Sequence, residues 1–120
     1  MQSTKLRHFA AGVVLMTGLV SGSPAQADEE ELPPFPAELL GQREYIDIGK
    51  GVFTQICKFC HGKSAYPGKA PKLNPSRYTP EFVFNRVTNG FRGMPSFKEQ
   101  FTEKERQGVV VYVLSKEFSN

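Results

Sequence analysis

Two cysteines and a histidine stand within five consecutive residues and are the side chains of this chain best suited to chemistry. Cys57 and Cys60 are separated by two residues, and His61 follows directly. On one helical turn, this spacing lets both sulfurs form thioether bonds with the vinyl groups along one edge of a porphyrin. The imidazole can then turn toward the iron as an axial ligand. The pattern therefore predicts one covalently attached haem of the c type.

The same residues are compatible with other kinds of site. A thiol–disulfide oxidoreductase also uses Cys-x-x-Cys, but it needs a strand–helix–strand scaffold, and this sequence favours helices and loops. A zinc site built on Cys57, Cys60 and His61 would lack a fourth ligand, because the other histidine, His8, lies in an N-terminal segment that we expect to be removed. A third alternative keeps the haem but leaves its sixth position labile, as in a haem enzyme or gas sensor.

Residues 1–27 have the features of a cleaved secretory signal. Lys5 and Arg7 form a basic start, residues 9–20 are an apolar run, and Ala25-Gln26-Ala27 supplies the small residues that a signal peptidase needs. The apolar run is shorter than the roughly 20 residues that span a membrane, although an uncleaved N-terminal anchor is the alternative. We therefore expect export to the periplasm without a stable membrane anchor.

Residues 28–41 form a leader that is first acidic and then rich in proline. Residues 28–31 are all acidic, and residues 32–36 contain three prolines around Phe35. Such a composition favours extended backbone over helix or sheet. We expect either an extended segment laid over the surface through Phe35 or a disordered tail.

The charge balance argues against a nucleic-acid partner. The whole chain has a formal charge of +3, and loss of Lys5 and Arg7 with the signal would leave 13 basic and 12 acidic residues. Scattered lysines at this balance are typical of a solvated surface. A modest positive ring around an exposed haem edge would still attract an acidic redox partner. The candidate residues for that ring are Lys58, Lys63, Lys69, Lys72 and Lys98.

Apolar residues recur at helical intervals over residues 42–57 and predict a helix with one apolar face. Gly49 and Gly51 lower the helix propensity of this segment. A glycine inside a helix often allows a second element to approach closely, and we expect Gly49 to do so if another helix crosses here. The apolar positions are Tyr45, Ile48, Val52, Phe53 and Ile56.

Two further helices are indicated by their caps. Thr79 and Pro80 suit the start of a helix that Asn89-Gly90 would end. Thr102 and Glu105 form a Thr-x-x-Glu capping box, which predicts a helix over residues 103–117, although residues 108–114 would also suit a strand. The expected packed face of this helix consists of Val109, Tyr112, Val113 and Lys116 or Phe118.

Residues 61–75 contain three prolines and two glycines and show no periodicity, which predicts a loop. A loop of this length in a small domain is usually functional. We expect it to wrap round an edge of the haem.

At these residues the chain resembles the monohaem class I c-type cytochromes. In that family the N-terminal helix carries a glycine and an aromatic residue before the first haem cysteine, each four apart, as Gly49, Phe53 and Cys57 are here. The family's C-terminal helix crosses the first and offers an aliphatic and an aromatic residue three apart, like Val109 and Tyr112. For residues 42–120, the resemblance implies an all-α class I cytochrome c fold. Its N- and C-terminal helices cross, and short helices and loops wrap round one haem.

The resemblance also implies the ligand set. A family methionine in a Gly-Met-Pro loop supplies the sixth ligand to the iron, and Met94 stands in such a sequence. A family proline after the histidine accepts the imidazole Nδ1 hydrogen through its carbonyl, and Pro71 looks like that residue. The implied cofactor-binding residues are Cys57, Cys60, His61 and Met94, of which His61 and Met94 would bind the metal.

Several residues near these ligands have two possible roles. Arg92 and Tyr78 are candidates to bond a haem propionate, or they are ordinary surface residues. Three aromatic residues either wall the haem or belong to the general core. These are Phe59, Phe91 and Phe97.

Filling both axial positions leaves no site for substrate, oxygen or peroxide, so the resemblance implies electron transfer rather than catalysis. We therefore expect a monomeric carrier that is not an enzyme and that meets periplasmic redox proteins in small, transient contacts. The expected partners are a dehydrogenase, with a quinone-cofactor alcohol dehydrogenase as one candidate, and a terminal oxidase.

Overall fold

The computed structural model describes residues 31–62 and 70–118, and its elements there are helical. Helix α1 spans Arg43–Val52, α2 spans Lys58–His61, α3 spans Pro80–Asn89 and α4 spans Glu103–Val113. Short 3₁₀ turns occur at Ala37–Leu39 and Pro75–Arg77. In this part of the chain the β structure is limited to a single bridge between Phe91 and Met94. The all-α prediction is confirmed, and the valine-rich run 108–114 lies mostly in α4.

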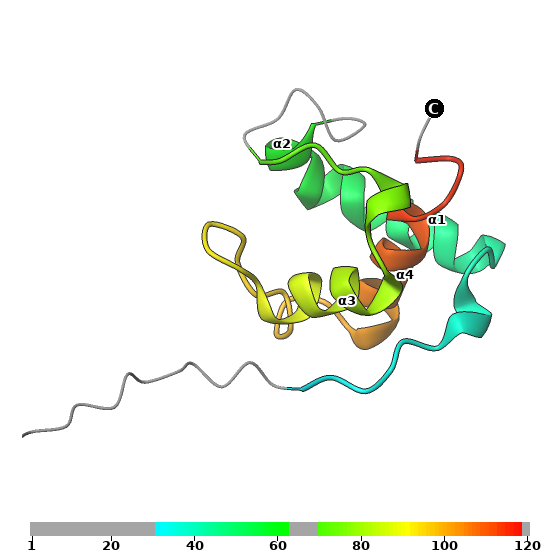
Figure 1. The fold of residues 1–120 in the computed structure, drawn as a ribbon. Helices are drawn as coiled ribbons and strands as arrows, with labels where there is room; N and C mark the ends of the chain where they lie inside the picture. The colour runs from blue at the N-terminus through cyan, green and yellow to red at the C-terminus, as the bar shows by residue number, and fades with distance from the viewer. Residues whose placement is uncertain (1–30, 63–69, 119–120) are drawn as a thin grey trace, which may run out of the picture.

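Helices α1 and α4 cross closely and form the centre of the fold (Figure 1). A Cβ atom added to Gly49 would lie 1.9 Å from the carbonyl oxygen of Gly108, and one added to Gly108 would lie 3.0 Å from the backbone nitrogen of Gly49. The two backbones therefore touch where neither residue has a side chain. The predicted close approach at Gly49 is confirmed.

The first predicted helix, residues 42–57, forms but is not uniform. After α1 the backbone passes through a π-helical segment, Phe53–Cys57, and continues directly as α2. Gly62, with φ of 79°, ends this run. The wider turn of a π-helix changes the direction in which each following side chain points. The helix thus extends four residues beyond its predicted end and carries Cys60 and His61 on its last turn.

The predicted caps of α3 and α4 are present. The hydroxyl of Thr79 accepts from the backbone N–H of Phe82, and Gly90, with φ of 77°, follows the last residue of α3. The side chain of Glu105 accepts from the backbone N–H of Thr102 at 2.8 Å, while the Thr102 hydroxyl accepts from the N–H of Glu105. Both helices begin where the sequence predicts.

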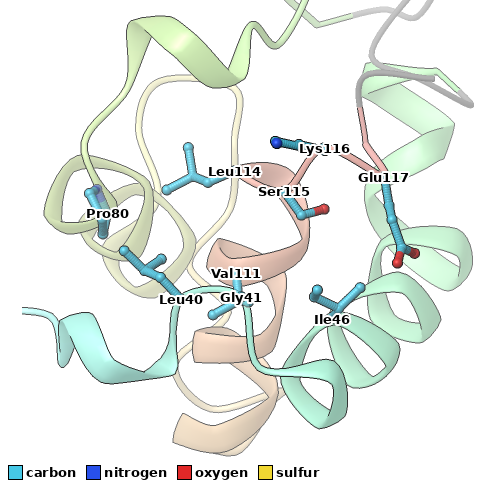
Figure 2. A pocket seen from close by; sticks show the side chains of 9 residues that line it. All are labelled: Leu40, Gly41, Ile46, Pro80, Val111, Leu114, Ser115, Lys116 and Glu117. Carbon is cyan, nitrogen blue, oxygen red and sulfur yellow. The ribbon is translucent and has the colours of Figure 1, made fainter.

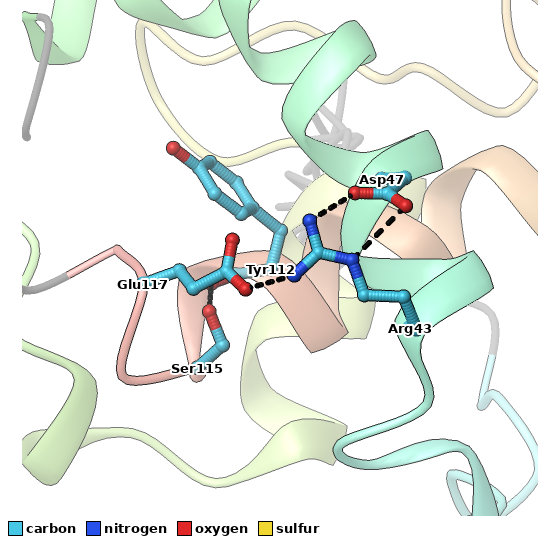
Figure 3. A network of polar contacts seen from close by, with 5 residues as sticks. All are labelled: Arg43, Asp47, Tyr112, Ser115 and Glu117. Atoms are coloured by element: carbon cyan, nitrogen blue, oxygen red, sulfur yellow. Dashed lines mark hydrogen bonds and ion pairs between the residues drawn. The ribbon is translucent and has the colours of Figure 1, made fainter.

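Helix α4 ends at Val113 rather than at residue 117, because the chain turns to bring Phe118 back into the core. The Phe118 ring packs edge-to-face on Phe53, with centroids 5.1 Å apart. The hydroxyl of Ser115 donates to the carbonyl oxygen of Tyr112 within this turn. Glu117 then meets Arg43 at the start of α1, which also binds Asp47 at 2.8 Å (Figure 3). These ion pairs are exposed, so the turn depends mainly on the burial of Phe118.

Residues 31–41 of the leader lie on the protein, as an extended stretch to Pro36 followed by the 3₁₀ turn at Ala37–Leu39. Phe35 is 5% exposed, and its ring meets that of Phe84 in α3 edge-to-face at 5.7 Å. Leu32 and Leu39 also pack against the core. For residues 31–41 the prediction of a segment held through Phe35 is confirmed over that of a disordered tail. The predicted signal and residues 28–30 lie outside the described residues.

The core is made by α1, α3 and α4, and it buries nearly every residue of α4 after Gln107. Val109, Tyr112, Val113 and Phe118 are buried as predicted, whereas Lys116 is exposed. None of the helices formed by residues 31–62 and 70–118 is long and apolar enough to cross a membrane.

Candidate functional site

The π-helical segment and α2 present the two predicted cysteines and the histidine from one continuous helical run. Cys57 is the last residue of the π-helical segment and lies partly buried against the core. Cys60 is exposed in α2, and His61 is its last residue. Both cysteines are free thiols. The structure therefore keeps the three side chains on adjacent turns, and neither sulfur atom is in a disulfide.

His61 is fixed by a bond to the loop that follows. Its Nδ1 atom lies 3.0 Å from the carbonyl oxygen of Pro71. Because a carbonyl only accepts, Nδ1 must carry the hydrogen, and this leaves Nε2 with the lone pair that a metal ligand needs. The bond predicted between His61 and Pro71 is confirmed. It sets both the tautomer and the direction of the ring.

Met94 lies on a tight turn between α3 and α4. The backbones of Phe91 and Met94 exchange two hydrogen bonds, each 2.9 Å long. The Met94 side chain is partly buried against the same hydrophobic core as Cys57. In Figure 1 this turn and α2 project on the same side of the α1–α4 crossing. The thioether is thus offered from a defined backbone turn rather than from within a helix.

The state of Cys57 disfavours the thiol–disulfide alternative. Burial raises the pKa of the Cys57 thiol to about 11, so the thiolate that attacks disulfides is scarce at neutral pH. The described residues also lack the strands of an oxidoreductase scaffold. No group of three or more His, Cys, Asp and Glu side chains in residues 31–62 and 70–118 is placed to hold a metal ion. The zinc alternative therefore gains no support from this part of the chain.

The three predicted aromatic residues occupy different environments. Phe59 is 69% exposed and Phe91 is 48% exposed, whereas Phe97 is 7% exposed in the core. Phe97 also packs on Phe101 at 5.8 Å. Its surroundings match the alternative of core packing. Phe59 and Phe91 are exposed next to the cysteines and Met94, and cationic side chains lie over their rings.

The two candidates for a propionate contact make aromatic contacts here. The ring of Tyr78 stacks on that of Phe82, with centroids 5.5 Å apart and planes 5° apart. The guanidinium of Arg92 lies 5.1 Å from the ring centroid of Phe91. Their predicted role stays a prediction. Of the five lysines proposed for a positive ring, Lys63 and Lys69 lie outside the described residues.

These residues fit a covalently bound haem. Two free thiols are spaced for thioether formation, and the imidazole has its Nε2 available. A methionine sulfur on a separate turn completes a His/Met donor set.

A separate pocket lies at the C-terminal end of α4, away from the predicted ligands. It has a volume of about 530 Å³ and a mainly apolar wall, with Val111 and Ile46 among its residues (Figure 2). Ser115, Lys116 and Glu117 stand at the turn after α4. None of the predicted ligands lines this pocket, so it is not the site that the sequence predicts.

Comparison with known proteins agrees with this geometry. Residues 44–113 match the family described as cytochrome c oxidase, cbb3-type, subunit III. The cytochrome c subunit of 4-cresol dehydrogenase (hydroxylating) from Pseudomonas putida is 29% identical, and the match covers 91% of this chain and 82% of that subunit. Cytochrome c6 from Leptolyngbya boryana is 35% identical over 57% of this chain and 88% of its own length.

A larger relative and one solved structure extend the comparison. The quinohemoprotein alcohol dehydrogenase ADH IIB from Pseudomonas putida is 30% identical over 82% of this chain, but the match spans 14% of that protein. The crystal structure of cytochrome cL from Methylophaga aminisulfidivorans superposes with a TM-score of 0.55 at 22% identity, over 74% of this chain and 69% of the other. This likeness confirms the predicted class I cytochrome c fold.

Two residues of the site region were missed by reasoning from the sequence. Gly108 faces Gly49 at the helix crossing, and an isolated glycine inside a predicted helix was the available signal. The guanidinium of Arg86 in α3 lies over the rings of both Phe82 and Phe91. No local pattern marks that residue, because its partners are set by the turn after α3.

Proposed function

We propose that this chain is a monohaem electron carrier of the periplasm. The chain belongs to the family described as cytochrome c oxidase, cbb3-type, subunit III, which is a family of c-type cytochromes. The single observation that best supports the proposal is the bond from His61 Nδ1 to the Pro71 carbonyl oxygen at 3.0 Å. It prepares an imidazole for iron at the position where Cys-x-x-Cys-His requires one.

The residues of the chain have distinct roles in this proposal. Cys57 and Cys60 would hold the haem through thioether bonds, and His61 and Met94 would bind its iron. The bound haem supplies one-electron chemistry at a potential that a His/Met ligand pair raises. Pro71 keeps the imidazole oriented and basic. With both axial positions filled, no substrate reaches the metal, so the chain transfers electrons and is not itself an enzyme.

The relatives suggest the class of partner. One is the cytochrome c subunit of a dehydrogenase, another is a quinohemoprotein alcohol dehydrogenase, and others are CcoP subunits of cbb3-type oxidases. We propose that this chain accepts electrons from a periplasmic dehydrogenase, with a quinone-cofactor alcohol dehydrogenase as the first candidate, and delivers them to a terminal oxidase. Its contacts with both would be small and transient.

The haem is tested first. The chain is expressed with its N-terminal segment in a host that exports proteins and attaches c-type haem. We expect a red periplasmic protein that begins at Asp28 and keeps its haem through acid–acetone extraction. A Cys57→Ser/Cys60→Ser variant should lose covalent haem, whereas each single variant should keep one thioether bond. A colourless but stably folded wild-type product from that host would overturn the proposal.

The partner is tested with the purified ferric protein. Its reduction is followed spectroscopically with quinone-cofactor alcohol dehydrogenases and with other periplasmic dehydrogenases, each with its own substrate. We expect fast reduction by a quinone-cofactor enzyme and reoxidation by a cbb3-type oxidase. Reduction by another class of dehydrogenase alone would replace the donor and leave the carrier role intact.

The labile-ligand alternative is tested on the same ferrous protein by adding carbon monoxide. A six-coordinate carrier should bind carbon monoxide slowly and to a small extent, and its ferric form should show a near-infrared charge-transfer band from sulfur. Rapid carbon monoxide binding without that band would favour a haem enzyme or gas sensor.

A further inference from the structure

The turn that carries Met94 is a two-residue hairpin with an unfavourable backbone at its tip. The N–H of Phe91 donates to the carbonyl oxygen of Met94, and the N–H of Met94 donates back, both at 2.9 Å. Between them, Arg92 has a φ of 52°, in the left-handed region that a side chain disfavours. A hairpin with such a tip needs contacts elsewhere to hold its shape.

The C-terminal arm of this hairpin is tied to the end of α3 by hydrogen bonds. The hydroxyl of Ser96 donates to the carbonyl oxygen of Thr88 at 2.6 Å. The backbone N–H of Phe97 donates to the carbonyl oxygen of Val87 at 3.1 Å. These bonds fix the chain just after Met94.

The N-terminal arm is tied differently. Gly90 has no room for a side chain, since an added Cβ would lie 2.6 Å from the Met94 carbonyl oxygen. Beyond it, Phe91 is 48% exposed, so burial holds its ring only in part. The guanidinium of Arg86, one turn earlier in α3, lies 4.3 Å from the Phe91 ring centroid and 5.1 Å from that of Phe82.

We propose that Arg86 is a positioning residue, which clamps the Phe91 arm of the hairpin to α3 and thereby keeps the Met94 sulfur in place as a ligand. The proposal rests on the axial role of Met94 given above. A planar guanidinium suits this position because it can stack between two rings, which an ammonium cannot do as well. The guanidinium of Arg92 lies 5.1 Å from the same ring centroid, but this contact is within the hairpin and does not tie it to α3.

The clamp is expected to change how often the methionine leaves the metal. A cation–aromatic contact of this exposure corresponds to a roughly 2- to 5-fold change in an equilibrium. Loss of Arg86 should therefore raise the apparent affinity of the ferric protein for an external ligand by about that factor. Imidazole is the suitable probe, because it is neutral and its binding does not respond directly to the lost charge.

The experiment titrates imidazole into ferric holoprotein carrying Arg86→Gln, Arg86→Lys, Phe91→Leu or the double change Arg86→Gln/Phe91→Leu. Lys50→Gln, an exposed charge change in the last turn of α1, is the control. We expect tighter imidazole binding with Arg86→Gln and with Phe91→Leu, an intermediate effect of Arg86→Lys and none of Lys50→Gln. Because the two residues act through one contact, the double variant should bind imidazole no more tightly than the tighter single variant.

Amide hydrogen exchange on the same holoproteins gives a second readout. The amides of Phe91 and Met94 should exchange faster in Arg86→Gln, while those of α1 should not change. Unchanged imidazole affinity and exchange in both Arg86→Gln and Phe91→Leu would overturn the clamp. So would fully additive effects in the double variant.

Met94→Ala separates this proposal from the one on which it rests. If Met94→Ala abolishes the near-infrared sulfur band but Arg86→Gln changes neither imidazole binding nor exchange, the clamp is wrong and the ligand role stands. If the wild-type protein lacks that band, the ligand role itself is wrong. Should Arg86→Gln fail to fold, Phe91→Leu and Arg86→Lys carry the same test.

Discussion

At the scale of single residues, Glu105 shows how one carboxylate secures the start of α4. Its Oε2 atom accepts from the backbone N–H and the hydroxyl of Thr102, both at 2.8 Å. Both bonds lower the pKa of the Glu105 carboxyl below its ordinary value of 4.5, and the bond from the backbone N–H has the larger effect. The ionised form is therefore favoured by folding, and α4 begins at a defined residue.

The pH dependence of this cap can be predicted with its sign. Since the folded pKa is depressed, the stabilisation by Glu105 is present above about pH 4.5 and is lost as the pH falls through the folded value. We expect wild type to exceed Glu105→Gln in free energy of unfolding at pH 7, with the difference shrinking toward pH 3. Denaturant unfolding of both holoproteins across this range measures it.

Glu103→Gln is the matched control, because it removes the same charge from the same turn without touching Thr102. A difference between wild type and Glu105→Gln that stays constant from pH 7 to pH 3 would contradict the prediction.

The site residues that sequence reasoning could predict are those whose partners lie nearby in the chain. Thr102 meets Glu105 three residues on, and Cys57, Cys60 and His61 stand on adjacent turns. The bond from His61 to Pro71 spans ten residues and was predicted through the family resemblance rather than from spacing. The contact of Arg86 with Phe91 depends on the chain direction after α3, which no local pattern records.

At the scale of elements, the crossing of α1 and α4 lies just before the turn that carries the cysteines of the proposed haem site. The α1 backbone meets α4 at Gly49, and one turn later the helix widens into the π-helical segment that ends in Cys57. Position and direction of the cysteines thus depend on a backbone contact that leaves no space for a side chain. A change at this contact should therefore alter both the free energy of unfolding and the surroundings of the haem.

Gly49 and Gly51 form a matched pair for testing this contact. Gly49→Ala places a Cβ atom 1.9 Å from a backbone oxygen, which only a shift of the helices can relieve, so we expect a loss of about 3 kcal/mol or more in stability. Gly51→Ala adds a methyl group with nothing within 4 Å and should gain about 0.5–1 kcal/mol. Denaturant unfolding of the holoproteins gives both values. Equal effects of the two changes would contradict the close crossing.

The presence of the helices was predictable here, but the π-helical segment and the end of α4 were not. Propensity does not separate α-helix from π-helix, so the Phe53–Cys57 segment was predicted as an ordinary part of the first helix. The end of α4 was predicted four residues late, because the helical pattern continues in the sequence. The chain leaves the helix because Phe118 gains a buried position against Phe53 and Tyr112.

At the scale of the whole molecule, the extended segment before α1 acts as a strap over the α3–α4 side. Phe35 is its anchor, and the neighbouring leucines Leu32 and Leu39 pack beside it. The strap touches Phe84, which lies on α3 one turn before Thr88. It therefore packs on the side of α3 that carries Phe84, while Arg86 of the same helix contacts Phe91 in the Met94 hairpin.

Mutations on the two sides of α3 should then have separate effects. Phe35→Ala removes a buried ring and should lower the free energy of unfolding by about 3 kcal/mol, while the near-infrared sulfur band and the reduction potential stay unchanged. Leu40→Ala, a strap residue that is 41% exposed, is the control and should cost less than about 1 kcal/mol. Unfolding and spectra of the two holoproteins provide the measurement. If Phe35→Ala instead weakened the sulfur band at unchanged stability, the strap would be coupled to the ligand hairpin through α3, and the division of this helix into two independent faces would be wrong.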